Sequence, residues 1–366
     1  MSSVSPRVAL VHEWLVTWGG SESVLASLAN VYPEAPIYVL VSRGDERIAR
    51  AFGGRDVRTT WLDRLPGIRS FYRLALPLMP RVWRGVDLEG YDVVVTSSHS
   101  MAKSVRVLHG VHVCYCHSPP RYLWDLNEEY RSGAAALLRG PVLERLRRQD
   151  LRSAEGVDFF IANSRFVAER IERIYGRSAR VLHPPVDLDL FEPEPGSGSH
   201  YLAGGRLVGY KRIDRAIDAA NRAGFPLVVF GEGPERARLE AMAGPTVRFT
   251  GKVSHDGLRA LFRDARGFVF PGIEDFGILP VEAQAAGRPV IALAEGGATE
   301  TVIDGRTGVL YRDDSVEGLI EAWKRADSGE WDPDACRENG ERFSRPRFEQ
   351  EMAELVRELL ASNRGS

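Results

Sequence analysis

The sequence has few cysteines, no long apolar run and almost no excess charge, and each of these absences excludes a class of protein. Its three cysteines are too few and too scattered for a disulfide framework, so we expect a reducing, cytoplasmic compartment. No run of about 18 consecutive apolar residues is present, and the first residues lack the apolar core of a signal peptide. A formal net charge of −2 argues against a general nucleic-acid-binding surface, which is strongly basic.

Residues 61–85 mix aromatic and aliphatic residues with five arginines. Such a mixture is typical of a segment that lies at the interface of a membrane containing anionic lipid. The alternative is an amphipathic helix that packs on the protein core and is broken at Pro66, Pro77 and Pro80. The first interpretation predicts peripheral contact with the inner face of the plasma membrane.

Short β-branched runs alternate with helical patterns along the chain. The first series of expected strands covers 7–12, 36–41, 92–97, 112–116, 158–163 and 180–184, and the second covers 200–205, 226–231, 246–251, 267–272 and 289–293. Continuous apolar strands that alternate with helices predict parallel sheets covered on both faces. We therefore expect an α/β protein with two doubly wound, Rossmann-like domains facing a cleft. Ligands should bind outside the carboxyl ends of the strands.

The predicted domain borders follow from a break between the two series. The sequence FEPEPGSGSH combines proline, glycine and serine with a loss of periodicity. We place an N-terminal domain at 1–190, a linker at 191–199 and a C-terminal domain at 200–343. Residues 344–366 have the spacing of a helix that could pack on either domain, including back on the N-terminal one.

Gly19 and Gly20 precede a helical run just after the first expected strand. Their backbone allows an anion to approach the free N–H groups at the start of the helix. Ser21 is expected to cap this helix and Glu22 to favour its first turn. An ordinary strand–glycine–helix turn would explain the same residues. The G-x-G-x-x-G pattern of dinucleotide-binding folds is absent after this strand.

Arg206 and Lys211 follow the first strand of the second series. A guanidinium grips phosphate oxygens with two parallel hydrogen bonds, and an ammonium acts as a mobile point charge. Together they can neutralise a diphosphate without a metal ion. Two solvated cations on a loop are the alternative interpretation.

Two carboxylates, Glu274 and Glu282, flank a bend that is almost uncharged. Pro280 fits the first turn of a helix that ends at Gly287, so the N–H groups of residues 277–279 should face an anion. Carboxylates accept hydrogen bonds from sugar hydroxyls. This stretch therefore predicts a ligand that carries both hydroxyl and phosphate groups.

On these residues the chain resembles the GT-B glycosyltransferases of family 4. The resemblance rests on Arg206, Lys211 and the E-x7-E of Glu274 and Glu282. It extends over nearly the whole chain through WGGSE, HSPPRYLWDL, ANSRF, GGRLVGYK, FGEGP, GKVS, EDFGILPVE and EGGATE. The HSPPRYLWD form is most similar to enzymes of bacterial surface polysaccharide biosynthesis, many of which are mannosyltransferases.

The resemblance implies a role for each matching residue. Catalytic roles fall to Arg206 and Lys211 on the donor diphosphate, to Glu274 on the donor sugar and to His117 near the reacting centre. The implied donor-binding residues are Gly19, Gly20, Gly205, Gly231, Lys252, Val253, Phe276, Gly277, Ile278, Leu279 and Glu282. The N-terminal domain would be the acceptor side and the C-terminal domain would bind the nucleotide sugar.

Several polar residues at the ends of first-series strands are candidates for acceptor binding. They are His12, His99, Lys103 and Arg121, with Glu13 as a further candidate. A helix cap is the alternative role for the stretch that holds His99 and Lys103. Cys114, Cys116 and His117 have poor zinc spacing and suggest packing in a buried strand.

The resulting prediction is a retaining hexosyltransferase that moves a sugar, with mannose favoured, from a GDP- or UDP-linked donor to a hydroxyl acceptor. A polyprenyl-linked or polysaccharide precursor is the favoured acceptor. No metal or other cofactor is expected, since the family needs none and the leaving phosphate can accept the acceptor's proton. A sugar-nucleotide 2-epimerase on the same fold and a non-catalytic nucleotide-sugar sensor are the alternative functions.

Overall fold

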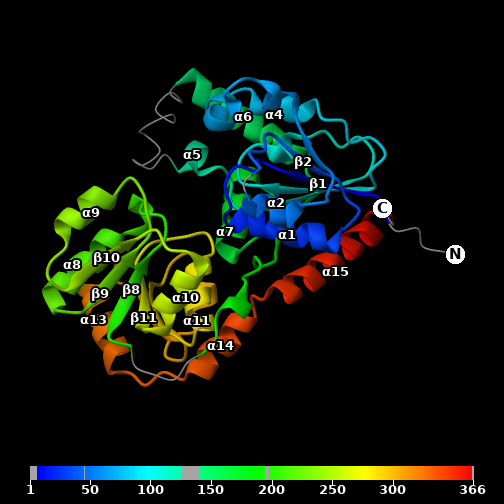
Figure 1. The fold of residues 1–366 in the computed structure, drawn as a ribbon. Helices are drawn as coiled ribbons and strands as arrows, with labels where there is room; N and C mark the ends of the chain where they lie inside the picture. The colour runs from blue at the N-terminus through cyan, green and yellow to red at the C-terminus, as the bar shows by residue number, and fades with distance from the viewer. Residues whose placement is uncertain (1–5, 45, 126–139, 194–197, 365–366) are drawn as a thin grey trace. The chain divides into compact units, whose positions relative to one another are not determined.

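The computed structural model describes residues 6–44, 46–125, 140–193 and 198–364. The chain forms two compact units: the first combines Met1–Pro185 with Pro346–Ser366, and the second is Val186–Arg345. Each unit is built on one parallel sheet with helices on both faces (Figure 1). The predicted α/β class with two doubly wound, Rossmann-like sheets is therefore confirmed.

The sheet of the first unit has the strand order β3-β2-β1-β4-β5-β6-β7. Its strands are β1 Val8–His12, β2 Ile37–Val39, β3 Val57–Thr59, β4 Val93–Ser98, β5 Val111–Cys116, β6 Phe159–Ala162 and β7 Ala179–Val181. All neighbouring pairs are parallel. The strand order reverses direction between β1 and β4, which is where ligands bind in sheets of this kind.

The helices of the first unit cover both faces of this sheet. They are α1 Gly20–Val31, α2 Glu46–Phe52, α3 Ile68–Phe71, α4 Met79–Arg84, α5 Arg121–Trp124, α6 Pro141–Glu155, α7 Arg165–Tyr175 and α15 Arg345–Arg364, with short 3-10 helices at Trp61–Arg64, Tyr72–Ala75 and Ala102–Ser104. Alternate strand residues face opposite layers: Leu10 packs in the core below α1 and α15, and Val11 packs in the core of α4.

The C-terminal helix α15 belongs to the first unit. Phe348, Met352, Val356 and Leu359 are buried in the same core as Leu25 of α1. Asn30 of α1 also donates a hydrogen bond of 3.0 Å to Glu349. Figure 1 shows the red helix α15 running beside the blue helix α1. The chain thus returns to its first unit after completing its second.

The sheet of the second unit has the order β10-β9-β8-β11-β12-β13, again with parallel neighbours. Its strands are β8 His200–Gly204, β9 Leu227–Phe230, β10 Val247–Gly251, β11 Ala265–Phe270, β12 Val290–Leu293 and β13 Gly308–Tyr311. The reversal of strand order lies between β8 and β11. A ligand is therefore expected beside the carboxyl ends of β8 and β11.

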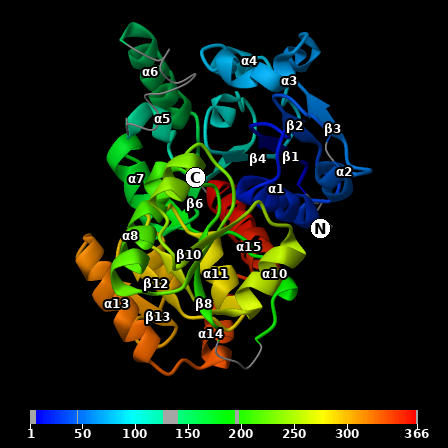
Figure 2. The same ribbon diagram turned by 60° about the vertical axis from the view of Figure 1, so that its left-hand side comes forward.

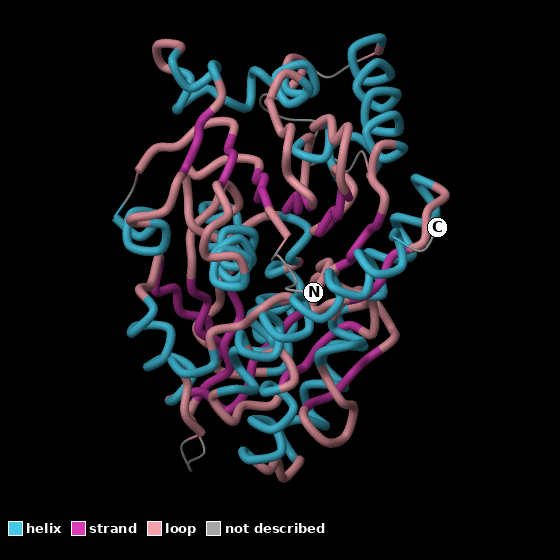
Figure 3. Tube along the Cα trace, turned by 90° about the vertical axis from the view of Figure 1, so that its right-hand side faces the viewer, coloured by secondary structure: helices cyan, strands magenta, loops and turns pink. Residues whose placement is uncertain are grey.

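Two helical layers cover the second sheet. The helices are α8 Ile213–Ala223, α9 Arg236–Met242, α10 His255–Arg263, α11 Ile278–Ala285, α12 Ala298–Thr301, α13 Val316–Ser328 and α14 Pro333–Glu341. In Figure 2, α8 and α13 lie on one side of the strands and α10 and α11 on the other. The two apolar clusters agree, since Val229 packs with α8 and α13 while Val228 packs with α10 and α11. Figure 3 shows the strands of each unit between their helices.

The border between the units differs from the predicted linker at 191–199. It lies at Pro185, because Val186, Leu188 and Phe191 are buried in the second core. Two strands, β3 and β13, were absent from the prediction. Both are edge strands, and β3 has no fully buried residue, so its sequence lacks a strong apolar pattern.

The segment 61–85 is neither one helix nor uniformly exposed. It forms four short helical pieces, and Pro80 lies in the first turn of α4 where it causes no break. Tyr72, Met79 and Trp83 are buried in the core. Within the described residues, none of the helices combines the length and apolar character needed to cross a membrane.

Candidate active site

Lys211 and Glu274 meet at the reversal of strand order in the second sheet. Lys211 lies seven residues after the end of β8, and Glu274 lies four residues after the end of β11. The Lys211 Nζ and the Glu274 Oε1 are 2.6 Å apart, with side chains 10% and 21% exposed. The carboxylate oxygen nevertheless has no hydrogen bond of good geometry among the described residues. The pair is thus held by charge and keeps acceptor capacity for a ligand.

Arg206 lies on the same loop and is exposed. Among the described residues no carboxylate forms an ion pair with it. Gly205 precedes it with φ +108°, and a Cβ at that position would come within 3.0 Å of both Lys211 Nζ and Leu279 Cδ1. Glycine at position 205 therefore lets the backbone lie against the lysine and the bend after β11.

The bend of residues 274–279 is supported from behind by the loop after β12. The Gly297 N–H donates a hydrogen bond of 2.9 Å to Glu274 O. A Cβ at Gly297 would clash with the backbone of Phe276, whose side chain is buried. The two glycines of EGGATE, Gly296 and Gly297, therefore position the bend, a role that their sequence pattern did not indicate.

Helix α11 begins at Ile278, with Gly277 as its N-cap at φ 86°. The start of the helix lies near Lys211, since a Cβ at Gly205 would come within 3.0 Å of both Leu279 Cδ1 and Lys211 Nζ. The free N–H groups of a helix start can bind an anion. Ile278 and Leu279 are half-buried. The helix ends at Ala285 rather than at the expected Gly287. Glu282 is its fifth residue, just beyond the first turn.

The other predicted donor residues of the second unit also follow strand ends. Gly231 comes directly after β9, and its N–H donates a hydrogen bond of 2.7 Å to Gly251 O. Lys252 and Val253 come directly after β10, with the lysine exposed and the valine half-buried. Because all the strands are parallel, these residues share one edge of the sheet with Arg206 and Glu274.

The first unit holds a chain of polar contacts at its own strand-order reversal. His12 ends β1 and its Nδ1 lies 3.1 Å from Ser97 Oγ of β4. The same hydroxyl lies 2.8 Å from His117 Nε2, just after β5. Ser97 was missed by the sequence analysis, although its position at the end of a predicted strand could have signalled it. It links the two histidines through one hydroxyl.

Glu13 positions the loop after β4. Its Oε1 accepts hydrogen bonds from Ser98 Oγ at 2.9 Å, Ser100 N at 2.8 Å and Ala102 N at 2.9 Å. The residue is fully buried. A buried carboxylate with three donors holds a loop in one conformation. Glu13 therefore fixes the loop that carries His99, which argues for a positioning role over contact with an acceptor.

The start of α1 differs from the predicted cap. Gly19 is the N-cap, and Ser21 instead donates a hydrogen bond of 3.0 Å to Glu22 Oε2. Glu22 is buried, and its other oxygen lies 3.5 Å from His12 Nε2. Burial alone would raise the pKa of Glu22, but His12 and His99 together hold it below its usual value. Any anion bound by Gly19 and Gly20 would lie beside this charged carboxylate.

Lys103 is placed in the core and not on a binding surface. Its Nζ lies 2.5 Å from Asp150 Oδ1 of α6, with side chains 2% and 0% exposed. Asp150 Oδ2 accepts from Trp124 Nε1 at 2.8 Å and Tyr175 OH at 2.9 Å. The prediction of an acceptor contact at Lys103 is therefore wrong for this structure, because its charge is already neutralised.

His99 and His117 lie with Trp14 in a partly enclosed aromatic group. The ring of His99 is 4.9 Å from that of Trp14 and 6.0 Å from that of His117. Burial lowers the pKa of both histidines, and their mutual repulsion with His12 lowers that of His117 further. Both are therefore neutral near pH 7. Arg121, the remaining acceptor candidate, begins α5 and is half-buried.

Over the described part of the chain, no group of three or more His, Cys, Asp or Glu side chains is placed to hold a metal ion. Cys114 and Cys116 are buried in β5 as free thiols. They pack with α6 and α7 residues, as the sequence suggested for a buried strand.

Two family models match most of the chain. "Glycosyltransferase Family 4" matches residues 18–190, and "Glycosyl transferases group 1" matches residues 193–343. The chain therefore belongs to glycosyltransferase family 4. The predictions of the family and of its class of enzyme, a glycosyltransferase, are confirmed.

Curated relatives support the same family over part of their length. A D-inositol 3-phosphate glycosyltransferase of Nocardioides is 30% identical over 47% of this chain and 46% of the relative. A GDP-mannose-dependent α-(1-6)-phosphatidylinositol monomannoside mannosyltransferase of Mycobacterium tuberculosis is 32% identical over 47% of this chain and 53% of the relative. The match thus spans about half the length of these relatives.

Solved structures share the fold over nearly the whole chain. Sucrose-phosphate synthase of Thermosynechococcus elongatus has a TM-score of 0.71 at 20% identity and covers 98% of this chain and 100% of its own. The HepE protein of Anabaena, solved with UDP and glucose, has a TM-score of 0.72 at 18% identity, with 96% and 99% covered. At these identities the likeness shows the fold alone.

Proposed function

We propose that this protein is a retaining glycosyltransferase that moves a hexose from a nucleotide diphosphate sugar to a hydroxyl acceptor. The observation that carries the proposal is the Lys211–Glu274 pair, which lies with exposed Arg206 and the start of α11 at the reversal of the second sheet. These groups offer cations and N–H dipoles for a diphosphate and carboxylate oxygens for sugar hydroxyls.

The diphosphate is the leaving group, so negative charge develops on it as the bond to the anomeric carbon breaks. Arg206, Lys211 and the first N–H groups of α11 oppose that charge without needing to reorganise. The acceptor oxygen forms the new bond to the anomeric carbon, and its proton passes to the leaving phosphate. Because the leaving phosphate accepts this proton, the reaction does not need a protein side chain as a base. Attack on the face from which the diphosphate departs retains the configuration.

The ion pair itself must change partners during this reaction. Without a ligand, Glu274 neutralises Lys211 at 2.6 Å. A bound diphosphate would take over the lysine charge, and the carboxylate would then be free to accept hydrogen bonds from the sugar. The side chains keep 10% and 21% exposure, so neither charge loses all contact with water while the partners exchange. Glu274 thus couples occupancy of the phosphate site to recognition of the sugar.

We assign the acceptor side to the first unit, around His117 and Ser97. His117 uses Nε2 toward Ser97, and its Nδ1 has no hydrogen-bond partner in the described structure. Since burial keeps this imidazole neutral, it can exchange a hydrogen bond with a hydroxyl without adding charge. A neutral partner suits a sugar ring that becomes positive in the transition state.

Mannose is the proposed sugar, and a polyprenyl-linked or polysaccharide precursor is the proposed acceptor. Support for mannose comes from the GDP-mannose-dependent mannosyltransferase among the relatives. A UDP-linked sugar is the alternative donor, because the Anabaena protein of similar fold was solved with UDP. We propose that the protein acts at the cytoplasmic side of the membrane.

The test is to incubate the full chain with single nucleotide sugars, with and without lipid extract, and to analyse nucleotide, sugar and lipid products by mass spectrometry. Transfer to the extract supports the proposal, and NMR of the product reports whether the anomeric configuration is retained. Conversion of the nucleotide sugar without an acceptor would identify an epimerase. Binding with no turnover in any mixture would identify a sensor.

We further propose that the segment 61–85 contacts an anionic membrane surface. Five large apolar side chains there are exposed, by 45% to 63%: Trp61, Leu65, Phe71, Leu74 and Leu78. Arg64, Arg73 and Arg81 are exposed among them. Aromatic side chains beside cations match the interface of an anionic bilayer. Flotation with vesicles should be reduced by Phe71→Ser with Leu74→Ser, whereas equal flotation of this variant would contradict the contact.

A further inference from the structure

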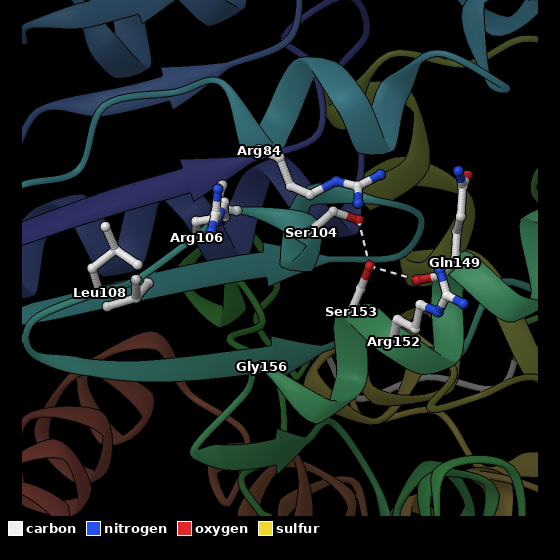
Figure 4. A pocket seen from close by; sticks show the side chains of 10 residues that line it. Arg84, Ser104, Arg106, Leu108, Gln149, Arg152, Ser153 and Gly156 are labelled. Atoms are coloured by element: carbon white, nitrogen blue, oxygen red, sulfur yellow. Dashed lines mark hydrogen bonds between the residues drawn. The ribbon is translucent and has the colours of Figure 1, made fainter.

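The first unit contains a second basic site that the transfer reaction does not use. It is a cavity of about 240 Å³ lined by residues of α4, α6 and the loop that leads into β5. Its lining includes Arg84, Arg106 and Arg152 together with Ser104 and Ser153, and none of the described residues that line it is acidic. Figure 4 shows these side chains around the pocket. All of them belong to the first unit, while Arg206 and Lys211 belong to the second.

The three arginines supply donors that no protein group occupies. All three are exposed, and among the described residues none forms an ion pair. Arg84 uses only its Nε, which donates a hydrogen bond of 2.9 Å to Pro80 O. The side chains of Arg106 and Arg152 form no hydrogen bond within the described chain. By contrast, Arg147, on the same helix as Arg152, is paired with Glu144 at 3.0 Å.

The floor of the pocket is already hydrogen bonded. Ser153 donates to Gln149 O at 2.7 Å, so the 2.8 Å contact between Ser104 and Ser153 must use the proton of Ser104. Figure 4 marks both bonds with dashed lines. The two hydroxyls therefore form a fixed polar surface, and the guanidinium groups provide the free donors above it. Gln149 Oε1, also in the lining, is an acceptor without a hydrogen-bond partner among the described residues. The free guanidinium donors outnumber it, and no described lining residue is acidic, so the pocket favours an anion such as a phosphate, whose protonated form can also donate to this oxygen.

We propose that this pocket binds a phosphate group, either a free phosphate or diphosphate, or the phosphate of a lipid headgroup. Three like charges around one cavity repel one another, and an anion with several oxygens removes that repulsion while accepting paired hydrogen bonds from planar guanidiniums. The volume is several times the roughly 30 Å³ share of one water molecule, so a phosphate group fits. The site goes beyond the proposed transfer reaction and does not depend on it.

Calorimetric titration of the full chain with pyrophosphate tests the site. Arg106→Ala and Arg152→Ala should each weaken binding about threefold to tenfold, with a larger loss in the double variant. Arg145→Ala is the matched control, because Arg145 is exposed on the same helix α6 but does not line the pocket. Arg206→Ala separates the donor site, since binding at the pocket should persist in that variant.

A second arm distinguishes the source of the phosphate. Flotation with phosphatidylcholine vesicles, with and without phosphatidic acid, is compared for the wild type and the double variant. Loss of flotation in the double variant assigns a lipid headgroup, and loss of pyrophosphate binding alone assigns a soluble phosphate. If neither ligand binds, or if Arg145→Ala has the same effect as Arg106→Ala and Arg152→Ala, the proposal is overturned. Failure of the transfer assay would leave both arms unaffected.

Discussion

The two units each contain a close lysine–carboxylate pair, and the two pairs differ in what surrounds them. In the first unit, Lys103 and Asp150 are 2% and 0% exposed, and Asp150 also accepts from Trp124 and Tyr175. In the second unit, Lys211 and Glu274 are 10% and 21% exposed, and Glu274 Oε1 has no well-aligned hydrogen bond among the described residues. One carboxylate is saturated, and the other keeps acceptor capacity.

This difference separates a structural ion pair from a binding one. A fully buried pair cannot be reached by a ligand, and breaking it leaves an uncompensated charge in the core. A pair that keeps some contact with water and an acceptor oxygen without a well-aligned hydrogen bond can exchange partners more easily. Burial alone would lower the pKa of Lys103, but the charge of Asp150 more than compensates and raises it, so this lysine stays charged. The following predictions test the contrast from the largest expected effect to the smallest.

Asp150→Ala should lower the free energy of unfolding by about 3–5 kcal/mol, because it strands the Lys103 charge and removes the acceptor for Trp124 and Tyr175. Urea unfolding followed by circular dichroism measures the change. Glu155→Gln is the control, since Glu155 is exposed on the same helix and should change stability little. A loss of less than about 1 kcal/mol at Asp150 would mean that the buried pair is not structural.

Lys211→Ala should reduce kcat by about 10²–10³-fold, because it removes a fixed cation from the leaving diphosphate. Its effect on the free energy of unfolding should stay near 1 kcal/mol, since the pair is partly exposed. Turnover with the donor found in the product assay is the measurement. Lys211→Arg keeps the charge and should recover part of the rate. Transfer at the wild-type rate by Lys211→Ala would contradict the diphosphate assignment.

Acid should destabilise the protein through buried His112. Burial lowers the pKa of His112 to about 4. In the neutral ring, Nδ1 donates a hydrogen bond of 3.0 Å to Gly156 O, and Nε2 accepts one from the Thr96 hydroxyl. Below pH 6.5 the unfolded histidine binds a proton that the folded one does not. Stability contributed by neutral His112 is therefore lost as pH falls from about 6.5 to about 4, at roughly 1.4 kcal/mol per pH unit.

Unfolding free energies measured across that pH range test the assignment. Variant His112→Gln should flatten this part of the profile, whereas the control His109→Gln at an exposed position should leave it unchanged. His99 and His117, whose pKa values are also lowered, contribute slope of the same sign. An unchanged slope in His112→Gln would refute the account.

Glu274→Gln has the smallest expected effect on nucleotide binding. Removing the carboxylate frees Lys211 for phosphate, so a free nucleoside diphosphate should bind equally well or up to about threefold more tightly. Turnover of the intact donor should fall, because the acid that accepts sugar hydroxyls is lost. Calorimetry with nucleotide compared with steady-state kinetics separates these effects. Nucleotide binding weakened as much as in Lys211→Ala would contradict the exchange of partners.

Much of the fold was predictable because its central strands are continuous apolar runs. The edge strands β3 and β13 were missed. β3 is three residues long and has no fully buried residue, so it shows no apolar pattern, whereas β13 is largely buried but only four residues long. The border between the units was misplaced because composition shows only where the chain is polar. The unit to which Val186 and Phe191 belong depends on which core buries them, and both are buried in the second. The return of α15 to the first unit was one of two options that its helical spacing left open.

The candidate residues of the second unit were predictable because they lie close together in sequence after strand ends. The candidate residues of the first unit were harder to predict from the sequence. Lys103 and His99 are separated by three residues, yet one is buried in an ion pair and the other lies in the aromatic group with Trp14. Ser97 joins His12 to His117 only because β1, β4 and β5 are neighbours. Side-chain partners of this kind depend on strand order.

By itself, the sequence determined the alternation of strands and helices and the residue types that can grip phosphate and sugar, because both depend on local pattern. Tertiary structure decided which of the two lysines is paired with a carboxylate that can still accept hydrogen bonds from a ligand. It also decided which glycines support the bend after β11 and which arginines lack a counter-charge. Those outcomes depend on burial and on atoms brought together from distant parts of the chain, and no local pattern records them.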